Sequence, residues 1–275
     1  MPYSDDTRGD RLFSFKQHVC VVTGGCTGIG LRVTQALIMN GARVYVVSNN
    51  RKALEQTSEG HWPSQGGSII PIACDLTNKE DLMYLVGEVE KREHRGIDLL
   101  VTAAGSEGER GTTPSMNAKE LQQMLFAEDQ REWLSTFNTN VSAIYFTTVA
   151  FLPLLQKCSG DGHAKASVII IASMSGLQSR LSGYFSYSAS KAATIHLSKM
   201  MAYEFQVFNV RVNSIAPGYF PSYNEGRQTQ LVPVGEENGT ESEIAQGVLF
   251  LAKNRFVTGE VLNIDKGESL CNPVN

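Results

Sequence analysis

Basic runs are absent from this sequence, and its formal net charge is −4. A nucleic-acid surface needs clustered Lys and Arg side chains, so the charge argues against that class of protein. The five cysteines form no Cys-x-x-Cys pair, and the five histidines are scattered without ligand spacing, so we expect no structural zinc. The cysteines indicate free thiols in a reducing compartment rather than a disulfide framework.

Membrane and export signals are also lacking. Residues 1–6 have neither the charged nor the apolar region of a signal peptide. We see no apolar run that approaches the ~20 residues needed to cross a bilayer. With 42% hydrophobic and 19% charged residues, the chain can bury a large core. We therefore expect a soluble, cytoplasmic protein.

Strand-like and helix-like patterns alternate along the whole chain, which is typical of a parallel sheet covered on both faces. No internal repeat or linker interrupts them, so we expect a single α/β domain over residues 1–275. Capping boxes at 77–80 and 240–243 each predict the start of a helix. The expected strands are 19–23, 44–47, 69–73, 97–102, 168–171, 210–215 and 260–264.

Two segments do not fit the alternation. Residues 106–131 are polar with a short helical patch at 118–127, and residues 219–239 are rich in Gly, Pro, Asn and Glu. Both follow the carboxyl ends of predicted strands, where open α/β sheets bind ligands. We expect an inserted loop at 106–131 and a substrate-binding loop at 219–239; the alternative is a solvated insertion that touches nothing.

A glycine-rich loop lies between the first predicted strand and the following helix. Residues 23–30 read TGGCTGIG and place Gly24, Gly28 and Gly30 in G-x-x-x-G-x-G spacing. Glycines there allow a tight turn and a close approach of the backbone to a pyrophosphate at the helix N-terminus. The loop predicts a dinucleotide site, with a glycine turn without a ligand as the alternative.

The end of the second predicted strand bears on which nicotinamide cofactor binds. An acidic side chain there would accept a bond from the ribose and repel a 2′-phosphate, but the residues are Ser48, Asn49, Asn50 and Arg51. Because Asn49, Asn50 and Arg51 could donate to a phosphate, we favour NADP(H), with NAD(H) possible. The alternative is that Arg51 simply opens a solvated helix.

Asp75 follows the third predicted strand. It either bonds the adenine amino group or caps the turn before Leu76.

Tyr187 and Lys191 are four residues apart in a helical stretch at 186–208, and so share one helix face. A neighbouring cation favours the phenolate, so this tyrosine could exchange a proton with a substrate oxygen near neutral pH. Ser173 follows the fifth predicted strand, and its hydroxyl could hold a carbonyl oxygen. Without Tyr187 nearby, the default interpretation of Ser173 would be a cap of a turn.

These motifs together resemble those of the classical short-chain dehydrogenases/reductases. The residues that carry the resemblance are the glycine loop, Ser173, Tyr187, Lys191 and the pair Pro217-Gly218. It covers about residues 15–268 and implies a Rossmann-type, doubly wound fold with a seven-stranded parallel sheet. It further implies that Asn140 is the active-site asparagine, which holds a water in a proton relay. Lys191 would also bind the nicotinamide ribose, and Ser222 would contact the carboxamide.

We thus expect the catalytic residues to be Ser173, Tyr187, Lys191 and Asn140. The expected cofactor contacts are Thr23, Gly24, Cys26, Thr27, Gly28, Ile29, Gly30, Ser48, Asn49, Asn50, Arg51, Asp75, Leu76, Ala104, Gly105, Asn140, Tyr187, Lys191, Pro217, Gly218, Tyr219, Phe220 and Ser222.

The chain departs from the family pattern at two places. Thr102 and Ala103 stand where the family has two asparagines, which removes two stabilising amides. Lys266 stands in the family's Asp-Gly-Gly, where subunits often pack. The resemblance implies a homodimer or homotetramer that associates through the helical stretches at 129–156 and 186–208.

A looser similarity, at 149–155 and 216–222, is to a rhamnolipid-type 3-oxoacyl reductase and to fungal secondary-metabolism members. It suggests a polyketide-, terpenoid- or aromatic-type ketone. The expected function is NADPH-dependent reduction of that ketone to a secondary alcohol. The alternatives are an NAD(P)-dependent alcohol dehydrogenase, a non-redox isomerase or dehydratase, and a cofactor-bound regulator.

Overall fold

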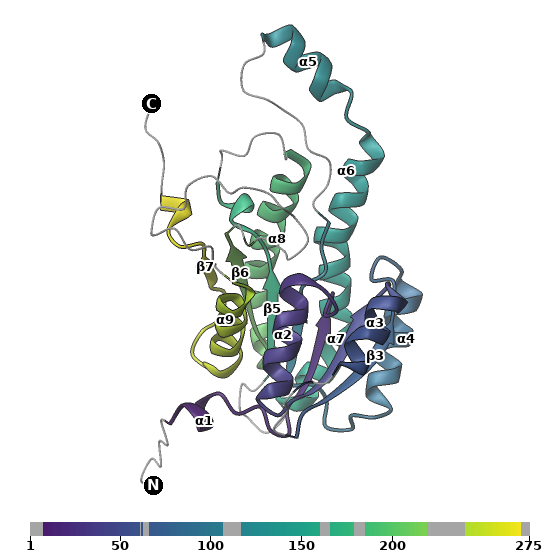
Figure 1. The fold of residues 1–275 in the computed structure, drawn as a ribbon, viewed down its shortest axis with the longest axis vertical. Helices are drawn as coiled ribbons and strands as arrows, with labels where there is room; N and C mark the ends of the chain where they lie inside the picture. Colours follow the sequence, from purple (N-terminus) through teal and green to yellow (C-terminus); the bar gives the residue numbers. More distant parts are fainter. Residues whose placement is uncertain are drawn as a thin grey trace.

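The computed structural model describes residues 8–60, 62, 66–106, 117–159, 166–178, 185–218, 220 and 240–270. In these residues, seven parallel strands form one sheet in the order β3-β2-β1-β4-β5-β6-β7 (Figure 1). This confirms the predicted Rossmann-type α/β architecture, and no predicted strand end is displaced by more than two residues. The strands are β1 (Val19–Thr23), β2 (Arg43–Ser48), β3 (Ser68–Ala73), β4 (Leu99–Thr102), β5 (Ser167–Ile171), β6 (Arg211–Pro217) and β7 (Val261–Ile264).

Helices cover both faces of the sheet. One layer consists of α2 (Gly28–Met39), α3 (Arg51–Glu59) and α9 (Glu241–Lys253). The other consists of α4 (Lys79–Glu90), α7 (Ala143–Cys158) and α8 (Phe185–Phe205). A short helix, α1 (Gly9–Leu12), precedes β1.

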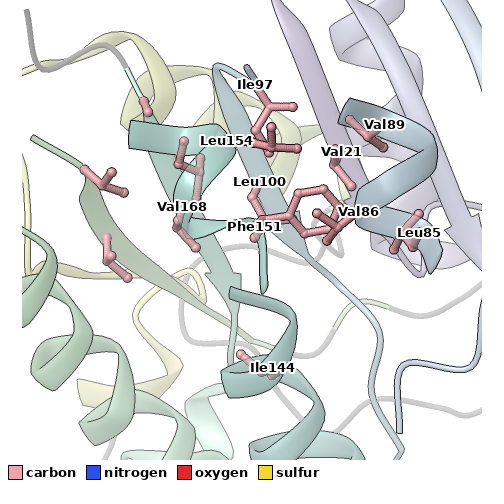
Figure 2. Close-up of a cluster of buried hydrophobic side chains, with 14 of the residues drawn as sticks. Val21, Leu85, Val86, Val89, Ile97, Leu100, Ile144, Phe151, Leu154 and Val168 are labelled. Atoms are coloured by element: carbon pink, nitrogen blue, oxygen red, sulfur yellow. The ribbon is translucent and has the colours of Figure 1, made fainter. Parts of the chain in front are cut away.

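The core is divided by the sheet into two apolar clusters. Figure 2 shows the cluster on the α4 and α7 side, where Phe151 and Leu154 lie near Val86 and Leu100. Successive residues of a strand point to opposite faces, so Val21 belongs to this cluster and Val22 to the one beneath α2. Burial of both faces explains why the inner strands are nearly continuous apolar runs.

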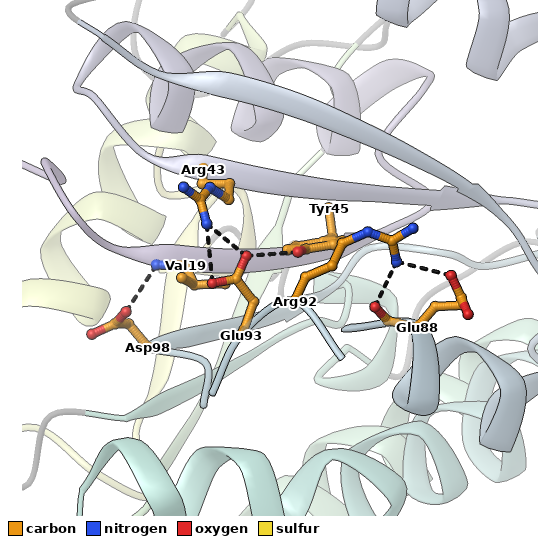
Figure 3. A network of polar contacts seen from close by, with 7 residues as sticks. All are labelled: Val19, Arg43, Tyr45, Glu88, Arg92, Glu93 and Asp98. Atoms are coloured by element: carbon orange, nitrogen blue, oxygen red, sulfur yellow. Dashed lines mark hydrogen bonds and ion pairs between the residues drawn. The ribbon is translucent and has the colours of Figure 1, made fainter. Parts of the chain in front are cut away.

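A polar network fastens the amino-terminal edge of the sheet (Figure 3). Glu93, just after α4, accepts hydrogen bonds from the Tyr45 hydroxyl (2.6 Å) and the Arg43 guanidinium (2.9 Å). Burial and the neighbouring Glu93 carboxylate raise the pKa of Tyr45 well above its ordinary value. Asp98 accepts from the backbone N–H of Val19 at 2.8 Å. The Glu93 bonds join the end of α4 to β2, and the Asp98 bond joins the start of β4 to β1, all at the amino-terminal edge of the sheet.

One of the two predicted capping boxes is wrong. Helix α4 begins one residue later than this box predicts and is capped by Asn78, whose side chain accepts from the N–H of Glu80. The Thr77 hydroxyl donates to Asp75 in the preceding turn. The other box is confirmed, since Thr240 and Glu243 bond each other's backbone at the start of α9.

The expected inserted loop is partly helical. Its patch at 118–127 is α5 (Ala118–Phe126), and its last two residues already belong to α6 (Gln130–Phe137). Figure 1 shows α5 standing away from the sheet and α6 leading down toward α7. Residues 107–116 lie outside the described part, as does the 219–239 loop apart from Phe220.

The continuous helix from Gln130 to Cys158 is long and apolar enough, by length and composition, to cross a membrane. Its apolar residues Phe151, Leu154 and Leu155 are buried in the sheet core, which accounts for the composition.

Lys266, after β7, has a left-handed backbone with φ +54° and an exposed side chain. This conformation costs a non-glycine residue about 1 kcal/mol. We expect Lys266→Gly to raise the free energy of unfolding by about 1 kcal/mol, measured by urea denaturation. Lys266→Ala is the control, because it removes the side chain but keeps the Cβ; an equal gain in both variants would rule out backbone strain as the cause.

Candidate active site

A cavity of about 520 Å³ lies at the carboxyl edge of the sheet. Thr23, Ser48, Thr102 and Ile171 line it from the ends of β1, β2, β4 and β5. The pairing is parallel throughout, so these strand ends meet at one edge, where open α/β sheets bind ligands.

The glycine loop forms one wall of the cavity. Gly24 has φ +67°, and a Cβ there would lie 2.7 Å from the backbone nitrogen of Ala104. A Cβ on Gly30 would lie 2.1 Å from the carbonyl oxygen of Gly24. Thr27 precedes α2 without making a side-chain cap, so no cap occupies the first N–H groups of the helix. These groups belong to Gly28, Ile29 and Gly30, which line the cavity. The loop can therefore hold an anion at the start of α2.

Cys26 is an exception within this loop. Its side chain is buried beside Ser48 and Thr57, and burial raises the pKa of the thiol. It is not among the described residues that line the cavity. Cys26 thus packs on the side of the loop that faces away from the cavity. Its place in the sequence, between the cavity-lining Gly24 and Gly28, gave no sign of this.

The residues after β2 divide into two groups. Ser48 and Asn49 line the cavity. Asn50 caps α3, because its side-chain oxygen accepts from the N–H of Ala53 at 3.1 Å. Arg51 is the first residue of α3 and is exposed; neither it nor Asn50 belongs to the described lining. The alternative in which Arg51 opens a solvated helix thus describes its position in the structure.

Asp75 and Leu76 line the cavity beyond β3. One Asp75 oxygen accepts from both the backbone N–H (2.9 Å) and the hydroxyl (2.7 Å) of Thr77, and these bonds lower the pKa of the carboxyl group. The structure thus shows the turn cap, one of our two alternatives, and the bond to the adenine amino group stays a prediction.

Tyr187 and Lys191 reach the cavity from the first turns of α8. The Lys191 Nζ lies 5.6 Å from the centroid of the Tyr187 ring and donates to the carbonyl of Ile171 at 3.2 Å. Lys191 is only 4% exposed, and this burial lowers the pKa of its ammonium group to about 8. The group therefore remains mostly protonated at pH 7 and presents a positive charge beside the phenol.

Ser173 lies between β5 and a short 3-10 turn at Met174–Gly176. Its Oγ accepts from the N–H of Ser175 at 3.1 Å, which is the turn cap that we gave as its default interpretation. A Cβ on Gly176 would lie 2.6 Å from the nitrogen of Ala192, so this turn packs directly on α8. Ser173 is not among the described lining residues of the cavity.

Asn140 lies in a π-helical turn, Asn138–Ser142, between α6 and α7, and it is fully buried. Its amide exchanges two hydrogen bonds of 2.9 Å with the backbone of Ser106 after β4. It also donates to the Ser190 hydroxyl at 2.9 Å. A Cβ on Gly105 would lie 3.3 Å from Asn140 Oδ1 and 3.5 Å from Lys191 Nζ, so these two side chains meet around one glycine. The residue pattern gave no sign of this; only the family resemblance singled out Asn140.

Two hydroxyl groups at the site were missed altogether. Thr102 and Thr147 line the cavity, and their Oγ1 atoms are buried without a hydrogen-bond partner in the described residues. Such atoms are costly unless a ligand or water satisfies them. With the glycine wall, they make a surface that fits a dinucleotide.

The remaining predicted contacts lie around the end of β6. Pro217 ends the strand, and a Cβ on Gly218 would lie 2.8 Å from the Cα of Asp265. Phe220 lines the cavity. Tyr219 and Ser222 are outside the described residues.

Residues 18–230 match the family model for the short chain dehydrogenases. The chain belongs to this family. It is therefore an oxidoreductase of the short-chain dehydrogenase type that acts on CH–OH or C=O groups. The chain is 36% identical to the short-chain dehydrogenase/reductase PhomF′ of Diaporthe leptostromiformis, over 95% of this chain and 94% of that protein.

Two solved structures of short-chain dehydrogenases show the same fold. One is the NADP active-site complex of RhlG from Pseudomonas aeruginosa, with TM-score 0.78 and 27% identity over 94% of this chain and 98% of that chain. The other is a 7α-hydroxysteroid dehydrogenase with NADH and 7-oxo glycochenodeoxycholic acid, with TM-score 0.79 and 25% identity over 94% and 97%.

The buried ammonium of Lys191 predicts a pH-dependent stability. In the unfolded chain its pKa is near ~10.4, so folding at neutral pH carries the cost of burying the charge. That cost falls as the pH rises through about 8, where the folded protein releases the proton while the unfolded chain still holds it. We expect Lys191→Met to be more stable than wild type by about 2 kcal/mol at pH 7. The difference should shrink as the pH rises toward ~10.

Urea unfolding of the protein without coenzyme at several pH values measures this difference. Lys199→Met is the matched control, because Lys199 is exposed on the same helix. A stability difference for Lys191→Met that stays constant with pH would contradict burial of the charge.

Proposed function

We propose that the protein is an NADPH-dependent carbonyl reductase that converts a ketone to a secondary alcohol. The substrate class that we propose is a mostly apolar polyketide-, terpenoid- or aromatic-type secondary metabolite. The observation that carries the reaction type is the presence of Tyr187 and Lys191 in the same cavity as the glycine loop. The steroid dehydrogenase structure above is a complex with NADH and a 7-oxo compound, which supports a ketone substrate.

The proposed chemistry divides between the coenzyme and the chain. The bound nicotinamide supplies the hydride for the carbonyl carbon. Tyr187 donates a proton to the developing alkoxide, and the Lys191 charge favours the phenolate that remains. Ser173 positions the substrate oxygen: its Oγ already accepts from Ser175, which leaves its own proton for that oxygen. Asn140 holds the water through which the proton is restored.

The same groups catalyse both directions, so an alcohol dehydrogenase has the same site. We favour reduction and NADPH because the cavity wall after β2 consists of Ser48 and Asn49, without a carboxylate in the segment 48–51. The NADP complex of RhlG supports this choice, and the NADH complex of the steroid dehydrogenase leaves NAD(H) as the alternative.

We further propose a homodimer or homotetramer in the cytoplasm. Tyr145 and Val149 on α7, and Met200 and Tyr203 on α8, are exposed and lie on the two helices expected to associate.

Tyr187→Phe tests the reaction type. Loss of the proton donor should lower turnover at least ~100-fold, while the affinity for NADPH changes less than ~3-fold. NADPH absorbance with a panel of apolar ketones measures turnover, and fluorescence titration measures binding. Tyr203→Phe is the control, since it deletes an exposed hydroxyl from the same helix. Turnover that survives unchanged in Tyr187→Phe would refute the assignment.

Asn49→Asp tests the coenzyme preference. A carboxylate at this cavity wall should repel a 2′-phosphate and weaken NADPH binding about tenfold or more, with little effect on NADH. Asn50→Asp adds the same charge one residue away and keeps the oxygen that caps α3, so a much smaller change is expected there. Equal losses for the two coenzymes, measured as dissociation constants, would argue against NADPH.

A further inference from the structure

The buried face of α8 is polar where a core helix is usually apolar. Ser190, Lys191, Thr194 and Ser198 follow one another on this face, and none is more than 4% exposed. Lys191 belongs to the proposed reaction, and Ser190 bonds Asn140. Thr194 is one turn further along, is fully buried, and is not among the described residues lining the cavity. A buried hydroxyl needs a hydrogen bond, so its partners show what it does.

Thr194 has two acceptors for one proton. Its Oγ1 lies 2.8 Å from the carbonyl of Ser190, the bond to residue i−4 that threonines commonly make inside a helix. It also lies 2.7 Å from the carbonyl of Asn140, which belongs to the π-helical turn before α7. The second contact is the unusual one, because it joins two helices that are distant in the sequence.

This contact belongs to a chain of hydrogen bonds that ends at the turn of Tyr187. The Thr194 hydroxyl holds the Asn140 carbonyl, and the Asn140 amide donates to the Ser190 hydroxyl. That hydroxyl donates to the carbonyl of Tyr187 at 2.7 Å. The backbone and the side chain of Asn140 are thus both fixed to the first three turns of α8. A π-helical turn departs from the regular helical ladder, and the Thr194 hydroxyl gives the Asn140 carbonyl of this turn a partner on another helix.

We propose that Thr194 is a positioning residue for proton transfer, which acts by holding the Asn140 carbonyl and so the Asn140 side chain beside Lys191. Thr194 is not among the described residues that line the cavity, and it acts only through Asn140. The role rests on the proposed function, in which Asn140 and Lys191 restore the proton to Tyr187.

Thr194→Val tests this role, because valine keeps the shape of the side chain and loses only the hydroxyl. Thr148→Val is the matched control: Thr148 on α7 is also fully buried and bonds the i−4 carbonyl of Ile144 at 2.7 Å. Both variants lose a buried bond within a helix, and only Thr194→Val also loses the bond to Asn140. Thr194→Ser restores the hydroxyl.

Two readouts are needed. The first readout is steady-state ketone reduction, which gives the pH profile of kcat and the KM for NADPH. We expect Thr194→Val to lower kcat about tenfold and to shift the pH profile, with the KM for NADPH within ~2-fold of wild type. Thr148→Val and Thr194→Ser should keep kcat within ~2-fold. A kcat and pH profile in Thr194→Val that match those of Thr148→Val would overturn the proposal.

The second readout is amide hydrogen exchange of segment 138–142 in the protein without coenzyme. We expect about tenfold faster exchange in Thr194→Val than in Thr148→Val. Equal exchange in the two variants would overturn the proposal whatever the kinetics. If wild type turns over no ketone, the proposed function fails and the role in proton transfer fails with it. Faster exchange would then still show that Thr194 holds the Asn140 turn.

Discussion

Parallel pairing of all seven strands is the constraint from which the site follows. After each strand the chain crosses back to the end of the sheet where that strand began. The carboxyl ends of all strands therefore lie at one edge of the sheet and the amino ends at the other. At the amino edge, the Glu93 network of Figure 3 joins the end of α4 to β2. At the carboxyl edge, Thr23, Ser48 and Ile171, far apart in the sequence, line one cavity. No single local pattern could bring them together.

Close backbone contacts then make the edge into a site. Gly24 touches the backbone after β4, Gly105 lies against both Asn140 and Lys191, and Gly176 lies against α8. A Cβ on Gly24 or Gly176 would clash with the backbone opposite, so these two loops lie directly against that backbone. Close packing also removes water from the Lys191 ammonium, which costs free energy of folding. The hydrogen bond from Lys191 to the Ile171 carbonyl offsets part of that cost.

Predictions from sequence succeeded where a pattern is local and repeated. The strands, the capping box of Thr240 and the helical patch at 118–127 are of this kind. They failed at the start of α4, where two neighbouring residues can both cap a helix: the helix begins one residue later than predicted, and Asn78 is its N-cap.

The sequence by itself determined the α/β class, the glycine loop and the pairing of Tyr187 with Lys191, because these depend on spacings of a few residues. The tertiary structure alone decided three features of the site. These are the hydrogen bonds around Asn140, the hydroxyls of Thr102 and Thr147 that lack a partner in the described residues, and the burial of Cys26 on the side of the loop away from the cavity. Each of these depends on residues that meet only when strands and helices pack. A polar side chain in a helix looks the same in sequence whether it faces water or a buried carbonyl, and only packing distinguishes the two.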